Sequence, residues 1–588
     1  MPYMKYLFSL IVCLIAFTGR ILAQDSTTAI RLDQEGFYPG APKIAVIVYS
    51  GNTPSSIPGT VFFVLRENGG DTVFRGKLSG LRPSNNSSLS TRIADFSELK
   101  QQGSFRILVP GLRDSYYFRI KEKVHRPAAL ASLKAFYYLR ASMALDPVFA
   151  GKWSRAAGHP DDSVIIHPSA VSANRKAGTI IATPGGWYDA GDYNKYIVNS
   201  GISTATLLSA YEDFEKYFDT LQTNIPSVGH GIPDILNEII YNLRWMLTMQ
   251  DPDDGGVYNK CTSAKFDAME MPSADHLLRY VVQKGTAATL DFAAVTAQAA
   301  RIFKKYGKEL PGLSDSCLTA SKKAWNWSLL HPDMAYDQQA MNALYEPKIT
   351  TGGYGDRTFS DERFWAASEL FITTGSMNYY DSLVDYINKP FGLPSWSQTG
   401  LLGYYSLIRN KEKMSKGEED SLRNRLIRMT DDYIRLSAQN AFLTVMGGRK
   451  SDFVWGSNAN AANQGILLLQ VYLFTHDKKY LDAALGNLEY ICGRNATGYC
   501  FITGIGSFSI RHPHHRPSVA DGIDDPIPGL MAGGPNPGQQ DHCHYDFHEA
   551  ETAYVDSDCA YASNEIAINW NAPLVYLANA VEALITSR

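Results

Sequence analysis

The segment RPAALASLKAFYYLRASM, residues 126–143, marks the point where the hydrophobic pattern of the chain changes. Before it, apolar and polar residues alternate in short runs, as they do in β-strands. From Pro127 onward, apolar residues recur about every 3.6 residues, as they do on one face of a helix. The segment therefore predicts a multidomain chain, with a β-domain over residues 25–124 and an all-α domain over residues 125–588.

The helical part contains apolar helices of similar length, separated alternately by short turns and by long glycine-rich loops. Pro233 and Asp477 stand near the start of two of them, as residues at helix N-termini often do. Six helical hairpins closed into a ring, an (α/α)6 barrel, fit this alternation. The predicted helices cover residues 127–143, 199–217, 232–249, 286–306, 312–330, 360–373, 377–387, 394–410, 418–438, 459–475, 478–492 and 566–585.

The N-terminal part, residues 25–124, predicts an immunoglobulin-like β-sandwich. Short apolar or alternating runs are separated there by clusters of Gly, Pro, Asn and Ser, and six or seven strands in about ninety residues are typical of such a sandwich. We expect the sandwich to pack on the barrel as a structural brace. The predicted strands cover residues 43–49, 61–66, 72–75, 89–96, 104–109 and 116–120.

Residues 1–24 predict a secretory signal peptide. Lys5 precedes an apolar run over residues 7–17, and Ala23 stands before Gln24 at the expected cleavage point. The run is too short to span a bilayer stably. The mature protein is therefore expected in the periplasm or outside the cell, with no membrane span.

The overall composition excludes one class of partner and favours another. Net charge is -4 and there is no long run of Lys or Arg, so nucleic acid is not an expected partner. Aromatic residues make up 12% of the chain, an excess that fits surfaces on which sugars stack. We expect a monomer whose ligand contains sugar rings.

Six cysteines follow the predicted signal peptide, and no two of them form a CxxC pair. Their scattered positions argue against a zinc ribbon or a disulfide scaffold and favour buried free thiols. A bridge between Cys543 and Cys559 is the alternative that an oxidising compartment leaves open.

A glycine-rich turn from Gly185 to Tyr196 places two carboxylates among aromatic rings. Its sequence, GGWYDAGDYNKY, carries Asp189 and Asp192 three residues apart. Aspartates in such turns often only bond their own backbone amides, and that structural role is one interpretation. The rings favour another, because sugars lay their apolar faces on aromatic side chains and a neighbouring carboxylate can move a proton.

The longest predicted loop, residues 493–564, carries the second group of polar residues. A loop of this length inside a compact domain is usually functional. Glu565 follows it and stands directly before the apolar residues of the last predicted helix. Burial at this place would raise the pKa of the carboxyl, whereas a helix N-terminus would lower it, and the sequence leaves the balance open.

Taken together, these motifs resemble glycoside hydrolase family 9 β-1,4-glucanases that carry an N-terminal immunoglobulin-like module. The resemblance spans almost the whole chain after the signal peptide. It rests on Asp189-Ala190-Gly191-Asp192, on Pro513-His514-His515-Arg516, and on Tyr554-x-Asp556 followed by Tyr561-x-x-x-Glu565.

The resemblance implies an inverting cleavage of β-1,4-glucosidic bonds. Glu565 matches the general acid, Asp192 the general base, and Asp189 the partner that helps to hold the attacking water. His514, Arg516 and Asp556 match positions that bind sugar hydroxyls or position the acid. Tyr354 and Trp455, on other long loops, are expected either to stack on sugars or to pack the rim of the barrel.

The expected function is that of an inverting endo-β-1,4-glucanase acting on cellulose-like chains, xyloglucan or mixed-linkage glucan. One alternative is an exo-acting enzyme that trims oligosaccharides from chain ends. A second, from a different class, is a non-catalytic glycan-binding protein that keeps the aromatic cleft.

Metal binding is the remaining expectation that the resemblance implies. Asp361 and Glu362 match acids that bind Ca²⁺ in relatives, and carboxylates suit that ion; a capped helix start is the alternative. Some relatives hold zinc through a Cys-His pair, but Gly158 precedes His159 at the matching place, so no zinc is expected there. No organic cofactor is expected.

Overall fold

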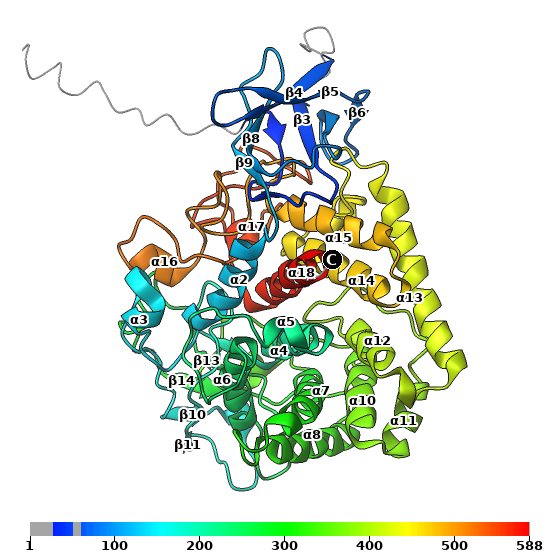
Figure 1. Ribbon diagram of the computed structural model, residues 1–588. Coiled ribbons are helices and arrows are strands. Elements are labelled where there is room, and N and C mark those ends of the chain that lie inside the picture. The colour runs from blue at the N-terminus through cyan, green and yellow to red at the C-terminus, as the bar shows by residue number, and fades with distance from the viewer. Residues whose placement is uncertain (1–27, 51–59, 587–588) are drawn as a thin grey trace, which may run out of the picture.

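The computed structural model describes residues 28–50 and 60–586. The predicted signal peptide, residues 1–24, lies outside the described residues. Figure 1 shows a β-rich N-terminal domain at one end of a larger helical domain, which confirms the predicted fold class. In the described part of the chain, no helix is both long and apolar enough to cross a membrane.

The N-terminal domain is a sandwich of two sheets whose inner faces share one apolar core. Along β8, Phe105 and Ile107 point inward while Arg106 is less buried, the alternation expected of a half-buried strand. One sheet has the order β1-β3-β7-β6 and the other the order β2-β9-β8-β4-β5. The strands are β1 (Ile30–Arg31), β2 (Gly36–Phe37), β3 (Ile44–Ser50), β4 (Val61–Arg66), β5 (Thr72–Lys77), β6 (Arg82–Pro83), β7 (Leu89–Asp95), β8 (Gly103–Leu108) and β9 (Phe118–Ile120).

The sandwich covers apolar surface of the helical domain. Val46 and Ile93 pack with Phe442 in a small cluster of buried side chains that the two domains share. Polar groups at the same interface are paired: Thr91 Oγ1 donates to the Ala441 carbonyl at 2.7 Å. Separating the two domains would expose this apolar surface to water, which is unfavourable. The interface therefore supports the expectation that the sandwich acts as a structural brace for the helical domain.

The helical domain contains a helix in each of the twelve predicted regions. Six of these helices, α4, α7, α10, α12, α14 and α18, alternate in sequence with the other six. Among them, α4 packs against α7 and α18, α10 against α7 and α12, and α14 against α18. The long helices are α2 (Arg126–Tyr138), α4 (Ile197–Asp213), α6 (Asp234–Thr248), α7 (Thr286–Phe303), α8 (Leu313–Leu330), α10 (Ser360–Thr374), α11 (Met377–Val384), α12 (Gly400–Arg409), α13 (Lys416–Ser437), α14 (Ser457–Thr475), α15 (Lys478–Ile491) and α18 (Ile568–Thr586).

Inner and outer helices differ in composition, as their burial requires. Nearly every side chain of α7 is buried, and its sequence, TAATLDFAAVTAQAARIF, is rich in small residues that let neighbouring helices approach. The outer helix α13 buries only one stripe and begins with a capping box between Ser415 and Glu418. The inner helices are therefore closely packed and form a rigid support, and functional residues can lie on the loops at its end.

One helix begins later than its sequence pattern predicts. The predicted helix over residues 394–410 begins at Pro394, but α12 starts only at Gly400. Before it, Ser395 and Gln398 form a turn in which Ser395 N–H donates to the Gln398 carbonyl at 3.0 Å. This turn keeps Trp396 out of the helix and in a loop.

A small sheet inside the helical domain was missed by the sequence pattern. Its strands are too short to show an alternation of apolar and polar residues. In sheet order they are β11 (Ile180–Ile181), β10 (Val164–Ile166), β14 (Arg279–Val281), β13 (Lys260–Ser263) and β12 (Lys195–Tyr196). Strand β12 contains the last two residues of the glycine-rich turn over residues 185–196, called the acidic turn below, and leads directly into α4.

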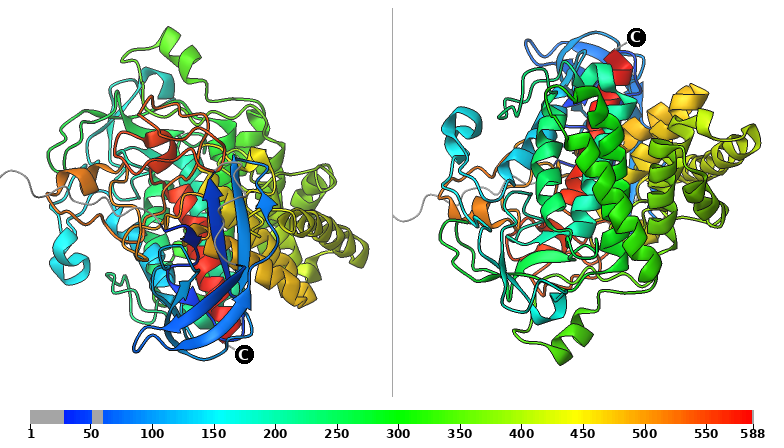
Figure 2. Two further views of the ribbon diagram at one scale, coloured as in Figure 1. Left: turned by 90° about the horizontal axis from the view of Figure 1, so that it is seen from above. Right: turned by 90° about the horizontal axis from the view of Figure 1, so that it is seen from below.

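The long loops gather on one side of the molecule. Figure 2 shows the cyan segments before α4 lying beside the orange and red segments that follow α15. Within the red segment, Cys543 and Cys559 form a disulfide, which resolves that alternative in favour of the bridge. Cys261, Cys317, Cys492 and Cys500 are buried free thiols, as expected.

Candidate active site

The acidic turn is held in a compact shape by close backbone packing. Gly186 has φ +80°, and a Cβ there would lie 2.8 Å from the ring of Trp245. A Cβ at Gly191 would lie 2.3 Å from the His514 carbonyl oxygen. Any larger residue at either position would push the turn away from its neighbours, so glycine is required at both.

Asp189, within this turn, has a fully buried side chain. Asn199, on α4, donates to its two carboxylate oxygens at 2.8 and 3.0 Å, and Tyr354 Oη donates at 3.1 Å. Burial, and then the nearby charge of Asp192, raise the pKa of Asp189 well above its usual value. Its main-chain oxygen also accepts from Ile568 N–H at 2.8 Å, which joins the turn to the start of α18.

Asp192 faces a cavity instead. Tyr196 Oη donates to its carboxylate at 3.4 Å, and the Asn194 side chain donates to the same oxygen. Asp192 is one of the residues that line this cavity. The turn thus separates its two acids: Asp189 is bound by protein groups, and Asp192 is presented to the cavity.

Glu565 approaches the turn from the far end of the sequence. It lies between the short helix α17 (Tyr561–Asn564) and α18, in extended backbone that bridges to His514. Gly191 N–H donates to Glu565 Oε1 at 3.3 Å, across 374 residues of sequence. This bond joins the backbone of the acidic turn directly to the second acid.

Burial decides the protonation of Glu565. Loss of hydration, and then the charges of Asp192 and Asp189, raise the pKa of Glu565 well above its usual value, while the Gly191 N–H only partly opposes them. Because α18 begins at Ile568, Glu565 is not in its first turn, and the lowering effect of a helix N-terminus does not dominate. Of the two opposing effects on the pKa of Glu565, burial therefore dominates, and the protonated form of its carboxyl group is favoured.

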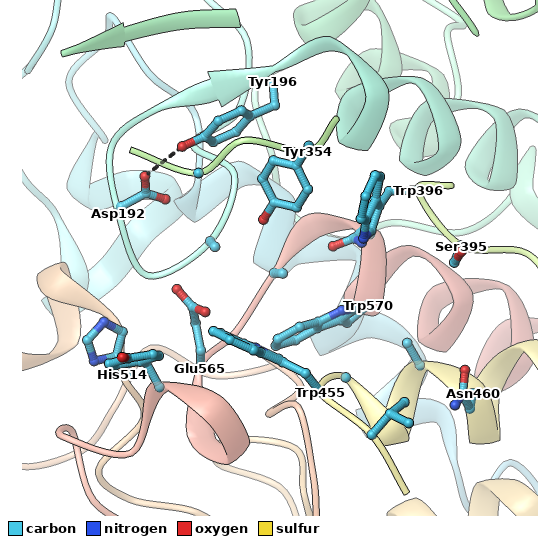
Figure 3. A pocket seen from close by; sticks show the side chains of 18 of the residues that line it. Asp192, Tyr196, Tyr354, Ser395, Trp396, Trp455, Asn460, His514, Glu565 and Trp570 are labelled. Atoms are coloured by element: carbon cyan, nitrogen blue, oxygen red, sulfur yellow. Dashed lines mark hydrogen bonds between the residues drawn. The ribbon is translucent and has the colours of Figure 1, made fainter. Parts of the chain in front are cut away.

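The two acids share one cavity of about 880 Å³. Figure 3 shows Asp192 and Glu565 on opposite walls, with aromatic rings extending to one side of them. Tyr196, Tyr354, Trp396, Trp455 and Trp570 all line this space. Rings beside a pair of carboxyl groups suit a sugar chain held across a proton-transfer site.

The other predicted polar residues fall into two groups. His514 and Arg516 line the cavity, although Arg516 Nη1 also donates to the Gly191 carbonyl at 2.7 Å. Asp556 lies behind the wall, where it accepts from His512 N–H at 2.9 Å and from the Asn564 side chain at 3.2 Å. Asp556 thereby fixes the residue directly before Glu565.

The aromatic residues were only partly anticipated. Tyr354 and Trp455 do line the cavity, and Trp455 is 43% exposed, so its ring is available to a ligand. Trp396 was not predicted as a site residue, because the run around it was interpreted as helix. The signal that could have identified the loop is the cluster of turn-forming Gly, Pro and Ser residues in residues 392–400, GLPSWSQTG.

A second group of acids lies below the loops, around the start of α10. Asp361 and Glu362 are buried there with Asp291, from α7, and Asp356. In the described part of the chain, no N–H or hydroxyl group donates to either carboxylate oxygen of Asp291 or of Glu362, and Asp361 accepts from Thr399 N–H at 2.8 Å. Asp361 and Glu362 both lie in the first turn of α10, and no described side chain caps its N-terminus.

The helical fold, with a cavity lined by two carboxyl groups, is that of a glycoside hydrolase. The chain belongs to glycosyl hydrolase family 9, whose profile matches residues 126–578, and residues 25–114 match the cellulase N-terminal ig-like domain. This confirms the resemblance found in the sequence, and with it an enzyme of an inverting family.

Known relatives extend over nearly the whole chain. The xyloglucan-specific endo-beta-1,4-glucanase BoGH9A of Bacteroides ovatus is 45% identical over 560 residues, covering 95% of this chain and 94% of the relative. Endoglucanase D of Acetivibrio thermocellus is 30% identical over 557 residues, covering 93% of this chain and 82% of the relative. A solved structure of a Bacteroides ovatus GH9 protein superposes with a TM-score of 0.89 at 43% identity, covering 95% of this chain and 99% of that one.

Proposed function

We propose that this protein is an endo-acting β-1,4-glucanase in which Glu565 is the general acid and Asp192 the general base. The supporting observation is that both carboxyl groups line one cavity with aromatic walls. Glu565 donates its proton to the glycosidic oxygen as the bond to the anomeric carbon breaks. Asp192 takes a proton from the water that attacks this carbon from the opposite face, so that a β-linkage yields an α-product.

The proposed role of Asp189 is to hold the site in shape. Its carboxyl group accepts from Tyr354 Oη, and Tyr354 lines the cavity. Asp189 itself is not among the lining residues. Asp189 therefore helps to position the attacking water indirectly, by holding Tyr354 and the backbone of the turn that also carries Asp192.

Xyloglucan is the proposed preferred substrate, with mixed-linkage glucan and unsubstituted chains as weaker ones. The support is the similarity to BoGH9A, whose name specifies xyloglucan, together with Gly353 in the cavity wall, where a Cβ would meet no atom within 4 Å. Such open space can admit xylose branches. This assignment rests on the chain as a whole rather than on one contact.

Paired viscosity and reducing-sugar assays on xyloglucan, mixed-linkage glucan and carboxymethyl cellulose test the proposal. An endo-enzyme lowers viscosity before much reducing sugar appears, and xyloglucan should give the fastest rate. Release of a single small product with little loss of viscosity would establish the exo-acting alternative. Binding without any release of sugar would establish a glycan-binding protein.

Calcium is proposed to sit among Asp291, Asp356, Asp361 and Glu362. Burial and the neighbouring carboxyl groups raise the pKa of Asp291 and of Glu362 well above their usual values, because no counter-charge lies among them. Hard carboxylate oxygens without partners are the donors that Ca²⁺ prefers. Bound calcium would supply the missing positive charge and brace the start of α10.

Chelation should therefore lower the melting temperature. EDTA is expected to reduce it by roughly 3 °C or more, because a ligand that binds only the folded state stabilises it. Added Ca²⁺ should restore the loss, and Mg²⁺ should restore it less. Glu362→Gln should melt lower and no longer respond to EDTA; an unchanged melting temperature in the wild type would dismiss the site.

Export and a monomeric state complete the proposal. Lys5, the apolar run over residues 7–17 and Ala23 support cleavage near residue 24. Mass spectrometry of the mature N-terminus tests the cleavage, and light scattering of the purified enzyme tests the monomer.

A further inference from the structure

The loop over residues 264–278 holds the acidic turn on both sides of Asp192. On one side, Tyr193 N–H donates to Asp267 Oδ2 at 3.3 Å. On the other, Arg516 Nη1 donates to the Gly191 carbonyl at 2.7 Å while its Nη2 donates to the Asp267 carbonyl at 2.9 Å. The two peptide groups that flank Asp192 are therefore both tied, directly or through Arg516, to Asp267.

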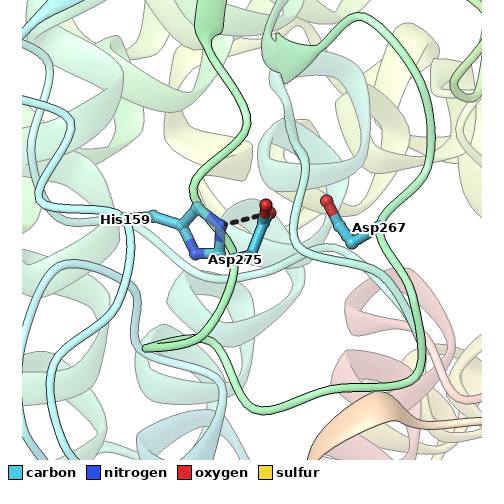
Figure 4. Close-up of side chains that lie close together, drawn as sticks. All are labelled: His159, Asp267 and Asp275. Carbon is cyan, nitrogen blue, oxygen red and sulfur yellow. Dashed lines mark hydrogen bonds and ion pairs between the residues drawn. The ribbon is translucent and has the colours of Figure 1, made fainter.

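The side chain of Asp267 is itself held in a buried chain of polar groups. Figure 4 shows it beside Asp275 and His159, and one ligand-type atom from each lies within 4.8 Å of the others. His159 Nε2 is 2.8 Å from Asp275 Oδ2, and His159 Nδ1 is 2.8 Å from Tyr188 Oη. These contacts hold His159 and Asp275 in place beside the side chain of Asp267, whose Oδ1 accepts no hydrogen bond from the described residues.

The carboxyl groups of Asp267 and Asp275 are close enough to influence each other's protonation. Burial, and then the hydrogen bond to Asp275, raise the pKa of Asp267 to about 7. The pKa of Asp275 is lowered, because its hydrogen bonds to His159 and Asp267 outweigh its burial. The other charged groups that act on Asp267 are Asp192, which raises its pKa, and Arg516, whose Nε is 3.6 Å from Asp267 Oδ2.

We propose that Asp267 is a positioning residue that fixes the orientation of Asp192 through Tyr193 N–H and Arg516. The inference rests on the proposed role of Asp192 as the general base. Asp267 does not line the cavity, so it acts through the turn rather than on the sugar. Below about pH 7 the carboxyl group of Asp267 is neutral and shares its proton with Asp275. Above about pH 7 both carboxyl groups are negatively charged, and their repulsion weakens the contact between Asp267 and Asp275.

Two substitutions separate positioning from simple support of the fold. Asp267→Ala removes the acceptor for Tyr193 N–H, and misplacing a catalytic group by about an ångström costs roughly 10- to 100-fold in rate, so kcat should fall by that factor with KM changed less than about twofold. Asp267→Asn keeps an acceptor for Tyr193 and a donor for Asp275, so it should restore most of kcat at pH 5. Lys265→Gln, an exposed change on the same loop, is the control.

The pH profile gives the second readout. A dinitrophenyl cello-oligosaccharide has a leaving group that needs no proton from Glu565. Any loss of kcat above pH 7 on this substrate is therefore attributed to the ionisation of Asp267 and not to that of Glu565. The wild type should show that loss, and Asp267→Asn should not. A wild-type kcat and pH profile in Asp267→Ala would overturn the proposal.

Two parallel measurements identify the cause of a failure. If Asp192→Asn retains activity, the assignment of the base is wrong; if Asp192→Asn is inactive and Asp267→Ala is normal, only the positioning role is wrong. Added Mn²⁺ or Zn²⁺ should leave the melting temperature unchanged. A rise in the melting temperature of the wild type that is lost in Asp267→Asn would show that His159, Asp267 and Asp275 bind a metal ion. It would contradict the proposal that Asp267 and Asp275 share a proton.

Discussion

Glu565→Gln is expected to reduce kcat on xyloglucan by roughly 10²- to 10⁴-fold, the usual contribution of a general acid. The glutamine fills the same volume and still accepts from Gly191 N–H, but it carries no proton that can pass to the leaving sugar. Substrate binding should be retained, because the rings that line the cavity are untouched. Steady-state kinetics and isothermal titration with a xyloglucan oligosaccharide measure the two effects separately.

The same variant has a diagnostic control. On a dinitrophenyl substrate, whose leaving group departs without protonation, Glu565→Gln should keep much of its activity, and Glu412→Gln, at an exposed position, should behave as wild type on both substrates. Activity on xyloglucan above a few per cent of wild type would remove Glu565 from the role of acid.

The pH dependence follows from the same side chain. The acid must be protonated to act, and burial raises its pKa well above the usual 4.5. Activity on xyloglucan should therefore persist above that pH and fall only where Glu565 ionises. A fall centred at or below pH 4.5 would contradict the buried acid.

Asp192→Asn is the second change with a large expected effect, again roughly 10²- to 10⁴-fold in kcat. The amide cannot take a proton from water, and this loss applies whatever the leaving group is. Both xyloglucan and the dinitrophenyl substrate should therefore become poor substrates, in contrast to the pattern for Glu565→Gln. Asp71→Asn, on the exposed β4–β5 hairpin of the sandwich, is the matched control.

Azide provides a positive test of the same assignment. A small nucleophile that needs no general base should restore part of the lost rate in Asp192→Asn and yield a glycosyl azide of α-configuration. Equal loss of rate in Asp189→Asn and Asp192→Asn, with rescue of both, would mean that the two acids act as one unit and would contradict their separate roles.

The regular part of the fold was predictable because its physical signal is local. Inner helices such as α7 carry small apolar residues throughout, and strands such as β8 alternate inward and outward residues, so each pattern can be recognised without knowledge of its neighbours. The predicted start of α12 was wrong because the helical periodicity of residues 400–410 was extended back to Trp396, whose backbone is in a turn. Residues 394–399 contain only Pro394 and Trp396 as apolar residues, and Trp396 lines the cavity.

The catalytic pair was recognisable from motifs, but its setting was not. Glu565 appeared to begin a helix, and only the structure shows that it lies in extended backbone bonded to Gly191. Asn199 and Asp267 carry no motif of their own, because their importance comes from contacts that the closed ring creates. Contacts between residues distant in sequence depend on how the helices pack, and a single sequence does not contain that information directly.

The anomeric configuration of the first product tests the central claim most directly. If Glu565 and Asp192 act from opposite faces of one linkage, NMR spectra recorded within the first minutes of xyloglucan hydrolysis should show the α-anomer at the new reducing end, followed by slow mutarotation. Initial formation of the β-anomer would require an attack from the other face and would contradict the account.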